Sequence, residues 1–221
     1  MSGSIVLAWR EPLFDLLRSL PKLEEAEAEH VAAGVAAFCD ESGFMVLKRA
    51  DLLLLAAKGL VGLRRVEDAR LLLESDDIYG RFAEGWLDGF DRLDSFGTLF
   101  PCFSRGVIVP GRWAGLQRGS MWILDMGRLV ISEEELHEIM VFRSVRWLLE
   151  QMAVLWDEQL GEGVLGLRGL GSNAMRRLFA EVESGDRSEV VKFVEQVLRC
   201  EGAERAWQNC PDVMVLPGRC E

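Results

Sequence analysis

Residues 161–177 hold the residue types best suited to ligand chemistry in this chain. Gly161, Gly163 and Gly166 match the spacing Gly-x-Gly-x-x-Gly, which in dinucleotide-binding proteins follows a strand and opens a helix beside a pyrophosphate. The segment before Gly161 has a helical pattern instead of a strand pattern, and the Gly-Lys-Ser/Thr end of a Walker loop is absent. The pattern therefore predicts a helix C-cap at Gly161 followed by a loop.

A second pattern begins where this loop ends. Gly171, Ser172 and Asn173 precede a predicted helix, and Arg176 and Arg177 fall in its first turns. Free backbone N–H groups at a helix N-terminus, together with two guanidinium groups, can receive an anion such as phosphate. Ser and Asn are also the ordinary N-caps of helices, and this structural role is the one that the residue types favour.

Catalytic and metal-binding patterns are not found elsewhere in the sequence. The chain has two histidines and five cysteines, without a Cys-x-x-Cys pair. His137 and Glu138 do not complete the His-Glu-x-x-His zinc motif, because Val141 stands where the motif has its second histidine. Asp125 lies at a predicted turn, where aspartate commonly serves local hydrogen bonding. We therefore predict no catalytic residue, no metal site and no cofactor, and we expect reduced cysteines.

Charge and hydropathy disfavour several classes of partner. Acidic residues outnumber basic residues by 36 to 25, which gives a net charge of −11. Nucleic acids and anionic membranes are bound by clustered Lys and Arg, so neither is an expected partner. The longest apolar run, residues 52–63, is shorter than the roughly 20 residues of a spanning helix and contains Lys58. No secretory signal is evident. We expect a cytoplasmic protein whose partner is another protein or a second copy.

Apolar periodicity predicts a mainly α-helical fold with a helical bundle. Separate helices are predicted over residues 23–38, 78–96 and 188–207. Short β-branched runs broken by Pro-Gly and Met-Gly-Arg turns predict a small antiparallel β element near residues 105–131. Its predicted strands are residues 107–109, 121–124 and 129–131. We expect one domain over residues 1–221, made of an N-terminal helical part (1–99), a β insertion (100–131) and a C-terminal helical part (132–221).

Residues 50–75 predict two antiparallel helices joined at Arg64 and Arg65. The small and large apolar positions of this pair resemble one tetratricopeptide unit: Leu53, Ala57, Leu60, Ala69 and Leu73. The resemblance covers about a tenth of the chain, and no second clear copy follows at the roughly 34-residue period of such repeats. It implies a helical hairpin at this position.

The longest predicted element is one helix from Ser132 to Leu160, roughly 40 Å in length. Ser132 and Glu135 can form its capping box. A broad apolar face contains Val141, Phe142, Val145, Leu148, Leu149, Met152, Leu155 and Trp156. A narrower and nearly opposite face contains Leu136, Met140, Trp147 and Val154. A surface helix needs only one apolar face. The second face predicts either a central helix packed on two sides, which we favour, or an interface with another chain.

These patterns together favour a non-catalytic helical interaction module, such as an adaptor, a chaperone-like subunit or a scaffold component. Its partner interface would be the narrow face of the long helix. The alternative is an enzyme or sensor that recognises a phosphate or another anion at the loop–helix junction from Gly171 to Arg177, with Asp125 or His137 nearby.

Overall fold

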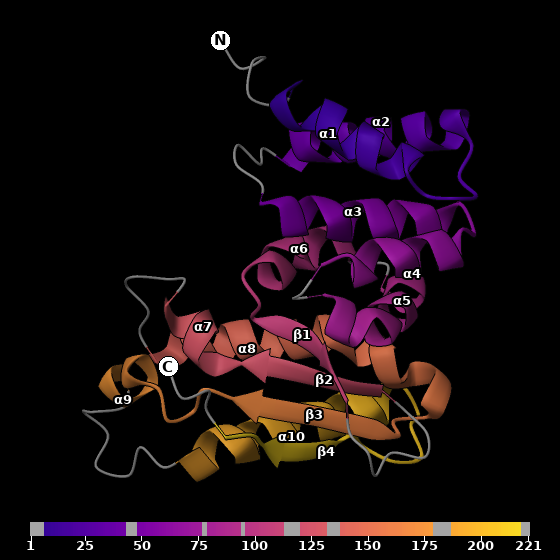
Figure 1. The fold of residues 1–221 in the computed structure, drawn as a ribbon. Helices are drawn as coiled ribbons and strands as arrows, with labels where there is room; N and C mark the ends of the chain where they lie inside the picture. The colour runs from indigo at the N-terminus through magenta and orange to yellow at the C-terminus, as the bar shows by residue number, and fades with distance from the viewer. Residues whose placement is uncertain are drawn as a thin grey trace. The chain divides into compact units, whose positions relative to one another are not determined.

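The computed structural model describes residues 7–42, 48–76, 79–93, 96–112, 120–131, 138–178 and 187–217 (Figure 1). The chain divides into two compact units, Met1–Asp91 and Arg92–Glu221. Over the described ranges the fold is mainly helical and includes a small mixed four-stranded sheet. The predicted mainly helical class is confirmed at this level.

The first unit is built of helices that pack on their neighbours along the chain. Its elements are α1 (Leu7–Arg18), α2 (Glu25–Ser42), α3 (Arg49–Gly62), α4 (Val66–Glu74), the 3-10 helix η1 (Gly80–Phe82) and α5 (Ala83–Arg92), whose last residue belongs to the second unit. α3 and α4 occupy the stretch predicted as a helix pair, and Arg64 makes the bend with a positive φ of 61°. The tetratricopeptide likeness of this pair stays a prediction.

Small side chains let the helices of this unit approach closely. The buried face of α2 carries Ala28 and Ala32, and Gly59 of α3 lies against Val31. Two aromatic side chains of the helix predicted over residues 78–96 are packed inside: Trp86 and Phe90 are each 1% exposed. Aromatic burial is the dominant source of core stabilisation in a domain of this size.

The thiol of Cys39, on the buried face of α2, is expected to resist alkylation. Burial first, and the Asp40 carboxylate second, raise the pKa of this thiol from about 9 to about 11. Only the thiolate is nucleophilic, so iodoacetamide at pH 8 should label the exposed Cys200 and Cys210 first. Cys39 should react only after unfolding in urea. Peptide mass spectrometry measures the labelling, and equal rates at Cys39 and Cys200 in the native protein would contradict the expectation.

The same raised pKa predicts the sign of a stability change with pH. The stabilising contribution of the protonated Cys39 thiol is complete below the unfolded pKa of about 9 and is lost as pH rises through about 11. Urea midpoints of the first unit should therefore fall over this alkaline range. A Cys39→Ala variant should show a smaller fall.

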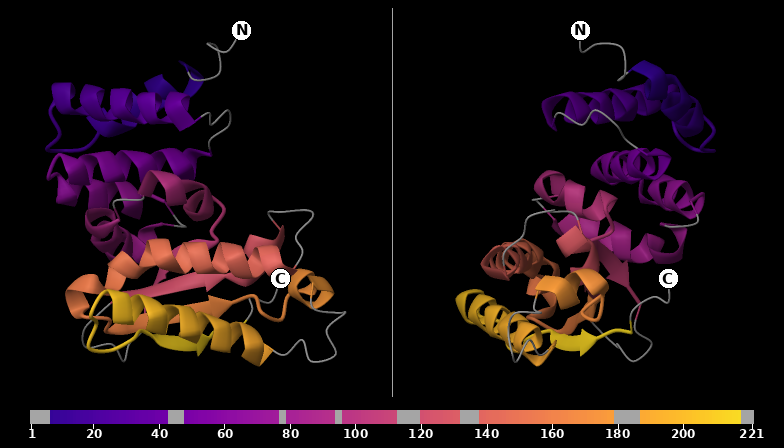
Figure 2. Two further views of the ribbon diagram at one scale, coloured as in Figure 1. Left: turned by 180° about the vertical axis from the view of Figure 1, so that it is seen from behind. Right: turned by 90° about the vertical axis from the view of Figure 1, so that its left-hand side faces the viewer.

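The second unit is an α/β arrangement around the sheet. Its elements are α6 (Phe96–Ser104), β1 (Ile108–Gly111), β2 (Ser120–Asp125), α7 (Met126–Ile131), α8 (Glu138–Met152), the 3-10 helix η2 (Ala153–Gln159), β3 (Gly163–Arg168), α9 (Asn173–Leu178), α10 (Arg187–Glu204) and β4 (Asp212–Val215). The strand order is β1-β2-β3-β4. β1 is antiparallel to β2, whereas β2, β3 and β4 run parallel. α8 and α10 lie side by side on one face of the sheet (Figure 2).

Buried aromatic and aliphatic side chains fill the space between these layers. Trp122 of β2 and Trp156 of η2 are at most 1% exposed, and the ring of Trp122 lies 6.4 Å from that of Phe103. On the opposite face of the sheet, Met121, Ile123 and Val164 form a smaller buried cluster. Successive side chains of β2 therefore pack on opposite faces of the sheet, because side chains alternate along a β-strand.

The prediction of one uninterrupted helix to Leu160 is wrong. The α-helix ends at Met152 and continues as the 3-10 turns of η2, while residues 132–137 lie outside the described residues. The carbonyl oxygen of Leu155 accepts hydrogen bonds from the Arg92 guanidinium at 3.0 Å and from the Ser120 hydroxyl at 3.3 Å. Side-chain donors thus satisfy a carbonyl group at the end of the helix, where intrahelical N–H partners run out.

The predicted central position of this helix is also wrong. Its broad face packs as expected, because Val141, Val145 and Leu148 are each 1% exposed. On the narrow face, Met140 is 46% exposed and Trp147 is 39% exposed. Together with α10, α8 covers one face of the sheet, whose strands come from well beyond residues 105–131, so α8 needs only one packed face.

The predicted β element is correct for its first two strands and wrong for its third. β1 and β2 pair antiparallel as expected, but residues 129–131 belong to the helix α7. The Asp125 carboxylate accepts a hydrogen bond from the backbone N–H of Arg128 at 3.1 Å. This N-cap contact starts a helix directly after β2. The loop predicted after Gly161 is wrong as well, since Gly163–Arg168 is the strand β3.

Candidate functional site

The carboxyl ends of β2 and β3 bring charged groups and two helix starts to one place. The last aligned pair of these parallel strands is Asp125 and Arg168. α7 begins immediately after β2, α9 begins shortly after β3, and the two short helices pack against each other. Parallel α/β sheets commonly bind ligands at this edge, so it is the first candidate for a site.

The charges at this edge are satisfied within the chain. The Arg168 guanidinium lies 2.8 Å from Oδ2 of Asp125, and both side chains are nearly buried, at 14% and 10% exposure. Oδ1 of Asp125 accepts the N-cap bond from Arg128, whose guanidinium also donates to the carbonyl oxygen of Arg105 at 2.9 Å. Asp125 therefore joins two strands and a helix. The turn role predicted for it is supported, with an ion pair that the sequence did not reveal.

Glycines at this edge allow two turns to approach closely. Gly169 has a positive φ of 77°, and a Cβ atom there would lie 2.6 Å from the backbone nitrogen of Gly127. A Cβ atom on Gly127 would in turn lie 3.2 Å from the Ser172 side chain. Glycine is required at Gly169 for conformation as well as for space. The turn is thus filled by protein atoms.

The predicted anion-binding residues lie at the start of α9. Gly171 and Ser172 are half-buried, Asn173 and Arg176 are exposed, and the side chain of Arg177 lies outside the described residues. The Ser172 hydroxyl accepts a hydrogen bond from the backbone N–H of Met175 at 3.2 Å, so it acts as an N-cap. The structure brings this turn close to Asp125, whereas His137 lies outside the described residues. Anion binding here stays a prediction.

The glycine pattern at residues 161–166 does not form a dinucleotide fingerprint. Gly163 and Gly166 lie within β3, whereas the fingerprint places its glycines in the turn after a strand. A Cβ atom on Gly163 would lie 2.3 Å from the Trp156 ring, and one on Gly166 would lie 2.7 Å from Leu216. These glycines provide space for side chains of the chain itself.

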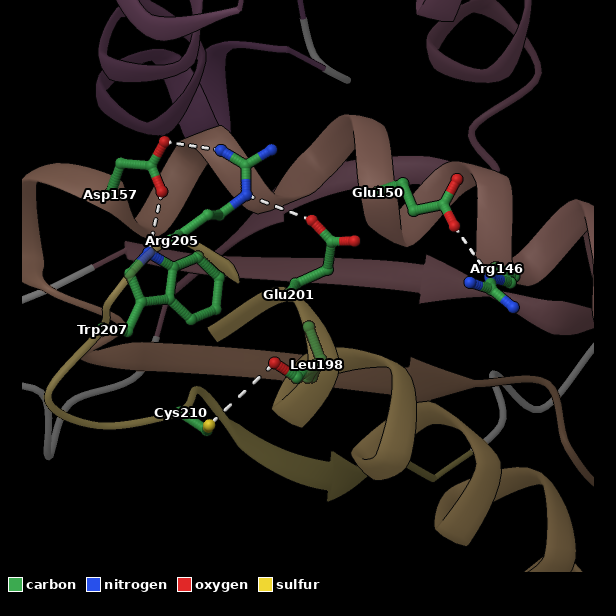
Figure 3. A network of polar contacts seen from close by, with 8 residues as sticks. All are labelled: Arg146, Glu150, Asp157, Leu198, Glu201, Arg205, Trp207 and Cys210. Atoms are coloured by element: carbon green, nitrogen blue, oxygen red, sulfur yellow. Dashed lines mark hydrogen bonds and ion pairs between the residues drawn. The ribbon is translucent and has the colours of Figure 1, made fainter. Parts of the chain in front are cut away.

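A polar network closes the opposite, amino edge of the sheet (Figure 3). We call Asp157, Glu201, Arg205 and Trp207 the amino-edge network. The Asp157 carboxylate accepts hydrogen bonds from the Trp207 indole N–H at 2.8 Å and from the Arg205 guanidinium at 2.7 Å. Arg205 also pairs with Glu201 at 3.1 Å. The network links η2 to the end of α10 and so fixes the start of β4.

Prolines protect both edge strands of the sheet from pairing with another strand. Pro110 lies within β1, and β4 stands between Pro211 and Pro217. Proline has no N–H group to donate, and short edge strands further limit pairing. Strand addition by a partner is therefore disfavoured at either edge.

The outer surface of α8 is the described surface that best fits a binding role. We call Ile139, Met140, Arg143 and Trp147 the α8 flank. Ile139 is 68% exposed, Met140 and Trp147 are exposed as given above, and Arg143 is exposed. Of the predicted interface residues, Met140 and Trp147 lie on the same side of α8, two helical turns apart. Val154 is half-buried in η2, and Leu136 lies outside the described residues.

Comparison with known proteins provides no relative from which a function could be inferred. No family model matches the chain, and neither a curated protein nor a solved structure matches it. Within the described ranges, no three His, Cys, Asp or Glu side chains are grouped so that they could hold a metal ion. In the same part of the chain, no helix has both the length and the apolar composition to cross a membrane.

Proposed function

We propose that this chain is a non-catalytic protein-interaction module that binds its partner through the α8 flank. The observation that carries the proposal is the exposure of Met140 and Trp147 on a regular helix whose opposite face is buried. Exposed large apolar side chains that are grouped on one element mark interaction surfaces more often than isolated ones do. Trp is also the residue type most enriched among the energetic centres of interfaces.

The anchoring of α8 favours such a role. Val145, Leu148 and Leu149 of α8 are buried, and the centroids of the Phe142 ring and the Phe193 ring of α10 lie 4.8 Å apart. A helix that is already fixed loses little conformational entropy when a partner binds. The seven-residue spacing of Met140 and Trp147 places both side chains on the same side of the helix, as in helix-in-groove recognition.

The other candidate surfaces offer less support for a binding role. At the carboxyl edge, Asp125 and Arg168 neutralise each other, and glycine contacts fill the turn. At the amino edge, the charges of Asp157 and Arg205 are paired. The proline residues disfavour strand addition. The α8 flank combines exposure with apolar character and therefore ranks first.

Affinity capture with matched variants tests the proposal. The wild-type chain and the Met140→Asp, Trp147→Asp and Leu71→Asp variants are used as baits in lysate of the source cells. Leu71 of α4 is 44% exposed and lies outside the α8 flank, so Leu71→Asp is the control. Proteins retained by the wild type and by the control should fall about tenfold or more with Met140→Asp and Trp147→Asp, as for loss of an interface anchor.

Two further measurements make the result decisive. Equal melting temperatures of the four baits show that the variants are folded, and light scattering reports whether the chain itself is dimeric. Dimers of the wild type that dissociate with Trp147→Asp would identify a second copy as the partner. Retention of the same proteins by all four baits would disprove the proposal.

A further inference from the structure

The charge of the α8 flank differs in sign from that of the whole chain. Arg143 is the one charged residue among the four that define the flank, so the flank carries +1 where the chain carries −11. Arg146 is paired with Glu150 at 2.8 Å. Arg143 is exposed and makes no ion pair with any described residue. Among the described residues, one uncompensated cation therefore lies beside the apolar side chains of the flank.

The position of Arg143 restricts the chemistry of a partner. Arg143 is one helical turn from Trp147 and one turn from Met140, so a partner that covers these two side chains also desolvates the guanidinium group. A cation removed from water without a counter-charge costs much of the binding free energy. A carboxylate binds a guanidinium group in a two-point, charge-assisted geometry and removes this cost.

We infer that the partner presents an Asp or Glu beside apolar side chains of its own, placed to pair with Arg143. The inference rests on the proposed function, because it specifies the occupant of the same flank. The charge complementarity at Arg143 is the observation that selects this occupant.

A second copy of the chain fits the flank less well. In a two-fold antiparallel pairing, Met140 of one copy would pack against Trp147 of the other. Arg143 lies midway between these residues in the sequence, so the two copies of Arg143 would meet near the symmetry axis. Like charges in contact at a desolvated interface are unfavourable. A carboxylate of another protein avoids this repulsion.

Charge reversal tests the inference separately from the proposed function. The proteins lost from the Trp147→Asp bait are measured again with Arg143→Glu, Arg143→Lys and Lys192→Glu baits. Lys192 is an exposed residue of α10 outside the flank, so its reversal is the matched control. Arg143→Glu should reduce capture about tenfold or more, and Lys192→Glu should stay within about threefold of the wild type. Arg143→Lys keeps the charge but loses the two-point geometry, so its capture should lie between these two.

Zero-length cross-linking then identifies the partner group. In the Arg143→Lys complex, a carbodiimide activates a partner carboxylate, and the amine at position 143 attacks it to form an amide with release of the urea. Mass spectrometry should find an Asp or Glu of the partner joined to position 143. Equal or stronger capture by Arg143→Glu would overturn the inference and leave the proposed function standing. Retention by Trp147→Asp as well would overturn both.

Discussion

Replacement of Asp125 by Ala should lower the free energy of unfolding of the second unit by about 3–5 kcal/mol, the range for breaking a buried ion pair. The change leaves the Arg168 guanidinium, which is 14% exposed, without its carboxylate partner. It also removes the N-cap acceptor of α7, since Oδ1 of Asp125 receives the N–H of Arg128. Urea unfolding followed by fluorescence of the buried Trp122 and Trp156 measures the loss.

A paired variant distinguishes the ion pair from the rest of the effect. Asp125→Ala combined with Arg168→Met removes both charges, and the double variant should be more stable than Asp125→Ala alone, because no buried cation is left unpaired. The remaining loss reports the contacts of Asp125 with Arg128, which are the N-cap bond, worth about 1 kcal/mol, and a longer ion pair at 3.7 Å. A single Asp125→Ala variant within about 1 kcal/mol of the wild type would contradict the structural role assigned to this carboxylate.

Replacement of Gly161 by Ala should destabilise the second unit by about 3 kcal/mol or more, among the larger single-residue effects. Gly161 has a positive φ of 87°, and a Cβ atom there would lie 2.1 Å from the carbonyl oxygen of Asn209. The neighbouring loop cannot retreat easily, because the N–H groups of Gln208 and Asn209 both donate to the carbonyl oxygen of Leu160. Conformational strain and steric conflict therefore add.

The same substitution at an open position is the control. Gly34 lies within α2, and a Cβ atom added there would meet no side chain and no neighbouring element within 4 Å. Gly34→Ala should therefore stabilise the first unit by about 0.5–1 kcal/mol. Urea midpoints of both variants provide the comparison. If Gly161→Ala unfolds like the wild type, the conformational and steric requirement assigned to Gly161 is wrong.

Helices were the part of the fold that local sequence could predict. The apolar repeat of residues 188–207 predicted α10 within a few residues, and its stripe of Val190, Val194 and Leu198 is buried. The bend at Arg64 was placed correctly between α3 and α4. In both cases the sequence pattern that predicts the feature lies within one or two helical turns, so the prediction depends on no contact between distant residues.

Strands and helix ends were predicted less well because their determinants lie far apart in the sequence. The glycine-rich β3 has no strand-like alternation, and it is a strand because β2 and β4 pair with both of its edges. The α-helix ends at Met152, and in the 3-10 turns that follow, the Leu155 carbonyl oxygen binds Arg92 and Ser120, more than thirty residues away. No window of local sequence contains these partners.

The candidate surface shows the same division. Periodicity alone identified Met140 and Trp147 as a second apolar face, since that depends only on the 3.6-residue repeat. Whether this face was covered depended on the tertiary structure, which buries the opposite face of α8 and leaves Met140 and Trp147 exposed. Likewise, the sequence placed Asp125 at a turn, but only the pairing of β2 with β3 brought Arg168 to it. Local periodicity determined which side chains share a helix face, and packing between elements distant in the sequence decided which of those faces are exposed to solvent.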